Sequence, residues 1–148
     1  MATAICFYSK HHGNTKKLLD AIREAEGSVE LIDITEQKKA DLSGYDRIGF
    51  ASGIYYGGFA KQLISFLKEN LPENKPVFFL YSAGRGVSDG FCRGIGAAAK
   101  EKNAKLLGSY GCMGFDTFGP LKLIGGVRKG HPDAKEIRGA VEFYKNLG

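Results

Sequence analysis

The sequence has no tryptophan, three cysteines and four prolines among its 148 residues. Cys6, Cys92 and Cys112 are odd in number and show neither a Cys-x-x-Cys pair nor metal-ligand spacing, which disfavours a disulfide scaffold and a zinc site. No apolar run approaches the ~20 residues that cross a bilayer. The first residues also lack the charged start and long apolar centre of a signal peptide. These absences predict free thiols, no membrane association and a cytoplasmic location.

Charge of one sign is not concentrated either. The net charge is +5, from 21 Lys and Arg against 16 Asp and Glu, and the cations are spread along the chain. Nucleic-acid binding needs a concentrated basic face with motif support, so it is not expected. A solvated surface is the simplest interpretation, with an acidic partner or an anionic ligand left open.

What the sequence does contain is an alternation of apolar runs and amphipathic segments. The runs cover residues 3–8, 28–34, 46–52, 75–82 and 104–115, and the helical patterns cover 14–25, 59–71, 90–102 and 131–147, the last with Pro132 in its first turn. Such alternation predicts an α/β fold, a doubly wound five-stranded parallel sheet with helices on both faces. The commonest strand order is 2-1-3-4-5. With no linker or internal repeat, residues 1–148 are expected to form a single domain.

Three loops follow the first, third and fourth predicted strands, at residues 9–15, 52–58 and 82–90. All three are rich in Gly, Ser, Tyr or His. In open parallel sheets, ligands bind at the carboxyl ends of the strands, beside the point where the strand order reverses. The sequence therefore predicts one binding site at that edge, built from these three loops.

The loop at 9–15 joins a strand to a helix, so its backbone N–H groups favour an anion such as a phosphate. Ser9, Asn14 and Thr15 add short side-chain donors, and Gly13 allows close backbone approach. The alternative interpretation is that Asn14 or Thr15 is only the N-cap of the helix, worth ~1 kcal/mol.

Several other chemistries are disfavoured by the residues present. His11 and His12 are adjacent and have no Cys, Asp or Glu at ligand spacing, which argues against a metal site. The loop lacks the first Gly and the Lys-Ser/Thr pair of a triphosphate-binding loop. Cys6 is followed six positions later by His12 rather than Arg, which excludes the tyrosine-phosphatase pattern. The segment 94–99, GIGAAA, fits a dinucleotide motif but falls inside a predicted helix, where helix–sheet packing explains it better.

The other two loops differ in character. One offers Tyr55 and Tyr56 beside glycines, and the other offers backbone N–H groups and the cation Arg85. A phosphate site next to an aromatic side chain suits a flat heteroaromatic phosphate ester, on which Tyr can stack. The two tyrosines could instead cap the core.

With these three loops in register, the sequence resembles the flavodoxin family, and specifically its short-chain members that bind flavin mononucleotide (FMN). The phosphate loop of that family ends in Thr-Gly-x-Thr, and the segment SKHHGNT keeps Gly13, Asn14 and Thr15. The resemblance implies the flavodoxin-like strand order, with the FMN phosphate on the first loop, Tyr55 or Tyr56 against the ring, and the third loop at its pyrimidine edge. The cofactor-binding residues it implies are Ser9, Lys10, His11, His12, Gly13, Asn14, Thr15, Ser52, Gly53, Ile54, Tyr55, Tyr56, Gly57, Ser82, Ala83, Gly84, Arg85 and Gly86.

The function implied by the resemblance is electron transfer through FMN, with no catalytic acid or base and an unknown redox partner protein. An NAD(P)H-dependent FMN or quinone reductase of the same fold is the alternative, and a non-redox module that binds a phosphate ester is a third. Three features depart from the family. His11 and His12 replace the small hydroxyl residues usual in the phosphate loop, and the other two features concern charge. The loop after the fourth strand carries Arg85, with Asp89 as its nearest acid, and the net charge is positive whereas the electron carriers are typically strongly acidic. A cation beside the flavin is expected to raise its potential.

Overall fold

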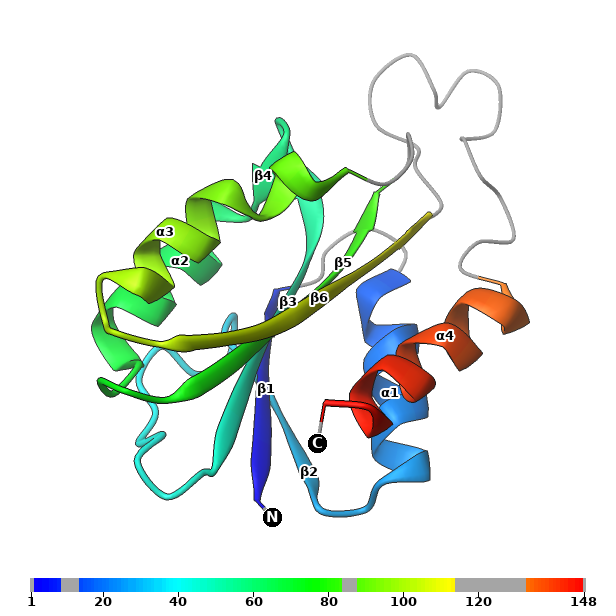
Figure 1. Cartoon of the computed structure of the whole chain (residues 1–148), viewed down its shortest axis with the longest axis horizontal. Coiled ribbons are helices and arrows are strands. Elements are labelled where there is room, and N and C mark those ends of the chain that lie inside the picture. The colour runs from blue at the N-terminus through cyan, green and yellow to red at the C-terminus, as the bar shows by residue number, and fades with distance from the viewer. Residues whose placement is uncertain (1, 9–13, 84–87, 114–132, 148) are drawn as a thin grey trace.

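Five parallel strands form the central layer of the protein, and helices cover both of its faces (Figure 1). The strands are β1 (Thr3–Tyr8), β2 (Val29–Asp33), β3 (Arg47–Tyr55), β5 (Pro76–Ala83) and β6 (Lys105–Met113). They pair in the order β2-β1-β3-β5-β6, which is 2-1-3-4-5 when the parallel strands alone are counted. The predicted fold class is confirmed. The structure is a computed structural model, and it describes residues 2–8, 14–83, 88–113 and 133–147.

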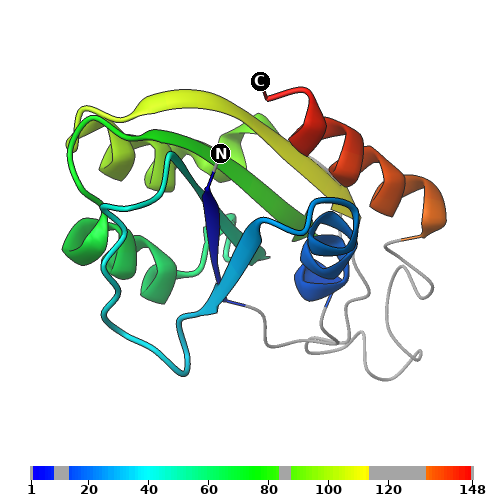
Figure 2. The ribbon, with the colours of Figure 1, turned by 90° about the horizontal axis from the view of Figure 1, so that it is seen from below.

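The helices lie in two pairs on opposite faces of the sheet (Figure 2). On one face are α1 (Asn14–Ala25) and α4 (Ala134–Lys145), and on the other are α2 (Lys61–Asn70) and α3 (Arg93–Lys100). Residues of β5 alternate between the two layers: Phe78 and Leu80 pack in the cluster with α1 and α4, while Phe79 and Tyr81 pack in the cluster with α2 and α3. The uninterrupted apolar run of β5 therefore reflects burial on both faces, as expected for a central parallel strand.

The end of β3 differs from the prediction. Residues 52–58 were expected to be a loop, but β3 continues to Tyr55 and forms a hairpin with a short antiparallel strand, β4 (Gly58–Phe59). Two residues, Tyr56 and Gly57, connect the strands, with φ of +52° and +82°. Two consecutive positive φ values are the mark of a type I′ turn, which is usually signalled by Asn-Gly. The first turn residue here is a tyrosine, so the sequence lacks the usual signal and did not predict the hairpin.

Two further expectations concern the helices. Pro132 was predicted in the first turn of the last helix, and this is wrong: Asp133 is the N-cap of α4 and forms a capping box with Glu136. The segment 94–99 lies within α3, as predicted. The crossover from β2 to β3, residues 34–46, contains no helix, although Ile34 and Leu42 within it are buried. No helix in the described part of the chain is both long and apolar enough to cross a bilayer.

Candidate functional site

The strand ends that precede the three predicted loops lie side by side at one edge of the sheet. Tyr8 at the end of β1 pairs in register with Ser52 of β3, and Gly53 of β3 pairs with Ser82 of β5. The order of the strands reverses between β1 and β3, because β1 leads to β2 on one side while β3 leads to β5 on the other. The structure thus brings the predicted residues of β3 and β5 together at the point where open α/β sheets bind ligands.

Thr15 and Ser82 form a buried hydroxyl pair at this edge. Their oxygen atoms are 3.0 Å apart, and the side chains are 1% and 4% exposed. The pair contains two hydroxyl hydrogens, and a single hydrogen bond between the oxygens uses one of them. No other hydrogen bond of these hydroxyls is present in the described residues. Within the described residues, one of these two buried hydroxyl donors, beside the start of α1, therefore has no acceptor.

Thr15 also settles the N-cap alternative. Asn14 and Thr15 are the first two residues of α1, so they lie inside its first turn and not at the N-cap position. The N-cap interpretation of Thr15 is wrong, because its hydroxyl bonds across the sheet edge to β5 and not to the backbone of its own helix. The first turn of α1 contains no acidic residue, which leaves the positive end of the helix dipole without a carboxylate.

Ser52 has a different arrangement. Its side chain is fully buried, its oxygen accepts a hydrogen bond from the Ala60 backbone N–H at 3.1 Å, and its hydroxyl donates to the Gly53 carbonyl. These bonds fasten the end of β3 to the residue that precedes α2. Ser52 thereby fixes the position of the hairpin between them.

The two tyrosines of the hairpin lie in different environments. Tyr55 is half-buried and meets the ring of Tyr8 edge-on, with centroids 5.8 Å apart. Tyr56 is 97% exposed at the tip of the turn. The alternative in which both tyrosines cap the core therefore applies to Tyr55, which packs against the core, and not to Tyr56. Ile54 beside them is half-buried on the same cluster.

Tyr81 holds the far end of the third loop, a role that the sequence analysis missed. Its hydroxyl donates to the Ser88 carbonyl at 3.0 Å and accepts from the Ser88 N–H at 3.2 Å. The Ser88 side chain in turn accepts from Gly90 N–H and caps the 3-10 turn η1 (Asp89–Cys92). Ala83, at the end of β5, is buried on the same side as Tyr81. Both ends of the segment 84–87 are thus anchored to one strand.

The remaining predicted residues lie outside the described part of the chain. They are Ser9, Lys10, His11, His12, Gly13, Gly84, Arg85 and Gly86, together with the side chain of Asn14. Their proposed roles stay predictions.

Two buried cysteines lie in the sheet, Cys6 in β1 and Cys112 in β6. Within residues 2–8, 14–83, 88–113 and 133–147, no group of three or more His, Cys, Asp or Glu could hold a metal ion. Burial raises the pKa of the Cys6 thiol, which lies in β1, to about 12, and mainly burial does the same for Cys112 in β6. Neither thiol is a nucleophile near neutral pH, because the thiolate is the reactive form.

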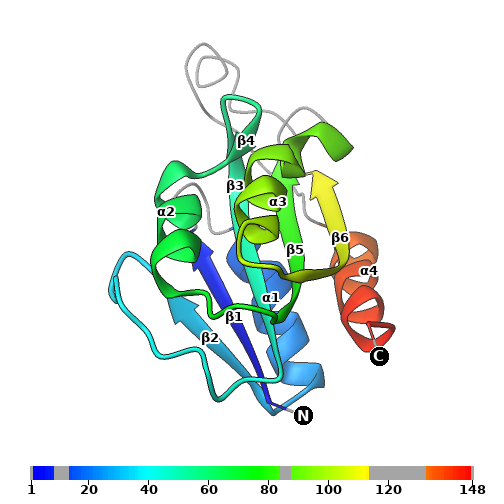
Figure 3. The same ribbon diagram turned by 60° about the vertical axis from the view of Figure 1, so that its left-hand side comes forward.

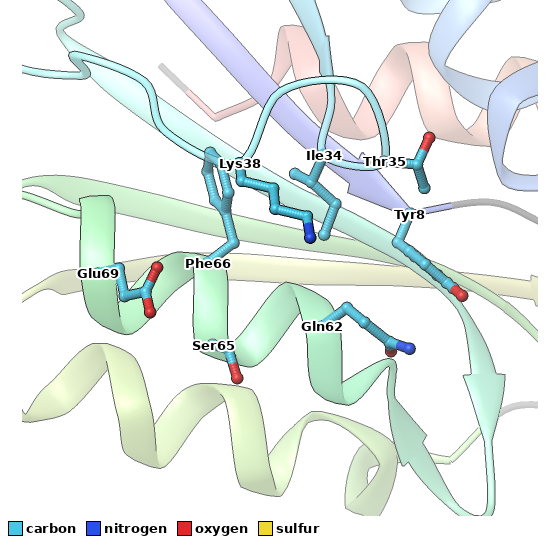
Figure 4. Close-up of a pocket in the computed structure, with 8 residues that line it drawn as sticks. All are labelled: Tyr8, Ile34, Thr35, Lys38, Gln62, Ser65, Phe66 and Glu69. Carbon is cyan, nitrogen blue, oxygen red and sulfur yellow. The ribbon is translucent and has the colours of Figure 1, made fainter.

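A hollow of about 540 Å³, which the sequence did not predict, lies beside this edge (Figure 4). It runs between α2 and the segment that follows β2, with Tyr8, Ile34 and Phe66 at its floor and exposed side chains such as Lys38 and Glu69 at its rim. Tyr8, which lines this hollow, also contacts the ring of Tyr55 in the hairpin.

Comparison with known proteins agrees with this geometry. Residues 5–105 match the family model described as a flavodoxin domain. An uncharacterised protein of Methanocaldococcus jannaschii is 34% identical over 148 residues, covering 99% of this chain and 98% of the relative.

Solved structures share the fold at low sequence identity. Flavodoxin 2 from Bacillus cereus has a TM-score of 0.70 at 17% identity, covering 99% of this chain and 97% of that one. An NADPH-quinone reductase from P. pentosaceus has a TM-score of 0.67 at 15% identity, with both chains fully covered. A flavoprotein from Lactobacillus acidophilus, in complex with FMN, has a TM-score of 0.55 at 15% identity, covering 76% of this chain and 93% of that one. The family model, which spans about two thirds of the sequence, and the well-covered relative show that the chain belongs to the flavodoxin family.

Proposed function

We propose that this protein binds FMN at the edge formed by β1, β3 and β5 and works as an electron-transfer protein. The observation that carries the proposal is the buried pair of Thr15 and Ser82, which keeps one hydroxyl donor at the start of α1. A phosphate is the natural acceptor there, because backbone N–H groups and the helix dipole at the same place also favour an anion. A structural neighbour with this fold is in complex with FMN, which supports the choice of phosphate ester.

The hairpin supplies the residue for the flavin ring. Tyr56 is held with a positive φ, a conformation that costs a non-glycine residue on the order of 1 kcal/mol, and is 97% exposed. Stacking on a flat ring would bury its face and offset this cost. Tyr56 is therefore the tyrosine proposed to stack, while Tyr55 supports the hairpin by packing on Tyr8. When bound, FMN supplies the redox chemistry, and the protein supplies binding and orientation.

The phosphate site is tested by titrating FMN into the purified protein and following its fluorescence and visible spectrum. Thr15→Val and Ser82→Ala are expected to weaken binding about ten- to a hundredfold, as for a lost hydrogen bond to a charged group. Thr3→Val is the matched control. Thr3 is also fully buried and accepts a hydrogen bond from Arg47 Nε, but it lies at the opposite end of the strands, where β1 begins. The proposal would be refuted if Thr15→Val and Ser82→Ala bound FMN as tightly as Thr3→Val does, or if the parent protein did not bind FMN.

A titration with NADPH in the absence of any added reductase separates the carrier from the enzyme. A carrier stays yellow when NADPH is added, whereas an NAD(P)H-dependent FMN or quinone reductase is bleached. The similarity to an NADPH-quinone reductase is a likeness of fold, and it makes this test necessary. A protein that binds other phosphate esters but not FMN would be the non-redox module.

A further inference from the structure

Three exposed residues lie in or next to the β3–β4 hairpin, and we call them the hairpin face: Tyr56 at its tip, Lys61 at the start of α2 and Arg93 at the start of α3. Lys61 follows β4 by two residues, and β4 contacts both α3 and the η1 turn that precedes it. Figure 3 shows the hairpin rising beyond the first turns of α2 and α3 at one end of the molecule. The three groups therefore belong to one surface.

Neither cation of the hairpin face is neutralised by the described part of its own chain. Among the described residues, an ion pair forms on α1, between Lys16 and Asp20 at 2.9 Å. Lys61 and Arg93 have no ion pair or hydrogen bond with a described side chain. In residues 53–61 and 88–94 the sequence has these two cations and a single acid, Asp89. The face is thus positive, in a chain whose net charge is +5.

The position of Lys61 is unfavourable for the fold itself. It is the first residue of α2, whose N-cap, Ala60, makes no side-chain hydrogen bond and whose first turn has no acid. A cation at the positive end of a helix dipole destabilises the helix, and a carboxylate there would do the opposite. Departures from such local rules are concentrated where function requires them.

From these observations we propose that the hairpin face docks an acidic protein that exchanges electrons with this one. Cations that have no partner among the described side chains, next to an exposed tyrosine, match an acidic surface, and Tyr and Arg are among the residue types that contribute most at protein interfaces. The inference rests on the proposed function, since Tyr56 is also the residue proposed to stack on FMN. A partner on the hairpin face would lie directly against the cofactor.

The test uses FMN-loaded protein and two probes of opposite charge, a small acidic iron–sulfur ferredoxin and a basic c-type cytochrome. Reduced ferredoxin is mixed with the oxidised FMN protein, which accepts its electron, and the dithionite-reduced FMN protein is mixed with oxidised cytochrome, which accepts an electron from it. Second-order rates are measured by stopped flow from low to high ionic strength. We expect the rate with the acidic probe to fall as salt rises, because screening removes the attraction, and the rate with the basic probe to rise. The opposite salt dependences, or rates that do not depend on salt, would overturn the proposal.

Charge reversal then locates the surface. The double variant K61E/R93E is expected to slow the acidic probe about tenfold at low salt, within the range of electrostatic steering. The matched control is K68E/K100E, which makes the same change on exposed residues of the last turns of the same two helices. Equal slowing by both double variants would show that only net charge matters, and would refute the hairpin face as the docking surface.

Failure of the proposed function is recognised separately. FMN content is read from the visible spectrum before each experiment, and binding of the acidic ferredoxin to the flavin-free protein is measured by interferometry. A protein that takes no FMN but binds ferredoxin through Lys61 and Arg93 loses the proposed function and keeps the docking surface. A protein that binds FMN but binds ferredoxin no better than its K61E/R93E variant keeps the proposed function and loses the docking surface.

Discussion

Replacing Lys61 by Glu should stabilise this protein while weakening its proposed interaction. Lys61 is exposed, makes no ion pair with another described side chain, and begins a helix that has neither a side-chain cap nor an acid in its first turn. The substitution removes a charge that opposes the helix dipole and adds one that complements it. The Lys61 side chain is exposed, so core packing should be unchanged.

The magnitude follows from the two parts of the change. A charge near a helix end contributes 0.3–1 kcal/mol in typical exposed settings, so removing an unfavourable charge and adding a favourable one should raise the free energy of unfolding by about 1 kcal/mol. For a domain of this size that corresponds to an increase in Tm of roughly 2–4 °C. The effect should shrink in high salt, because exposed charges are screened.

The assay is thermal and urea unfolding of the flavin-free protein at low and high salt. Lys68→Glu is the control: it makes the same charge change in the last turn of the same helix, about 10 Å further along the axis, and should lower stability by a similar amount. Opposite signs at the two ends of α2 are the signature of the dipole. Shifts of the same sign, or a loss of stability in Lys61→Glu, would refute the reasoning.

Three other predictions concern the core and the hairpin. Gly111→Ala should lower the free energy of unfolding, measured in urea, by about 1–3 kcal/mol. The reason is that an added Cβ would lie 2.1 Å from Cζ of the buried Tyr81 ring. An unchanged urea midpoint would show that the ring moves aside freely. Burial raises the pKa of Cys6 from 9.0 to about 12, so the protonated thiol contributes stability that is complete below pH 9 and is lost as pH rises through 12. Cys6→Ala should therefore make the free energy of unfolding fall less steeply with pH above 9. An equally steep fall in the variant would contradict this. Gly57→Val should weaken FMN binding and reduce the yield of the one-electron-reduced flavin, because φ is +82° there. Gly58→Val is the control: an added Cβ meets nothing within 4 Å at either glycine, but Gly58 has no positive φ, so both quantities should change less, and equal effects would contradict the prediction.

The order of the elements could be predicted because apolar runs and helical patterns alternate along the chain, except between the second and third strands. Burial on both faces makes a run such as Pro76–Ala83 apolar throughout, and the rules of parallel sheets then leave few strand orders. The same reasoning located the binding edge, because the ends of parallel strands follow from topology. The crossover at 34–46 was harder, since Ile34 and Leu42 are buried in it without forming a helix.

Side-chain roles at the edge could not be predicted, because they depend on contacts between residues distant in sequence. Thr15 and Ser82 are 67 positions apart, and nothing local indicates that their hydroxyls meet. The bonds between Tyr81 and Ser88 arise from the path of the chain after β5, and a buried tyrosine in a strand is otherwise an ordinary core residue. The turn at Tyr56 uses a residue type that type I′ turns seldom contain.

The contrast between α2 and α4 links stability to function in this fold. Helices that follow parallel strands begin at the carboxyl edge of the sheet, so every first turn there sees the same solvent face. α4 begins with a complete capping box of Asp133 and Glu136, and no predicted site residue belongs to it. α2 begins with Ala60 and Lys61, beside the hairpin that carries the proposed flavin contact, and has no side-chain cap. The same chain thus applies the stabilising rule away from the site and departs from it at the site, as expected if Lys61 is retained to meet an acidic partner and not to stabilise the helix.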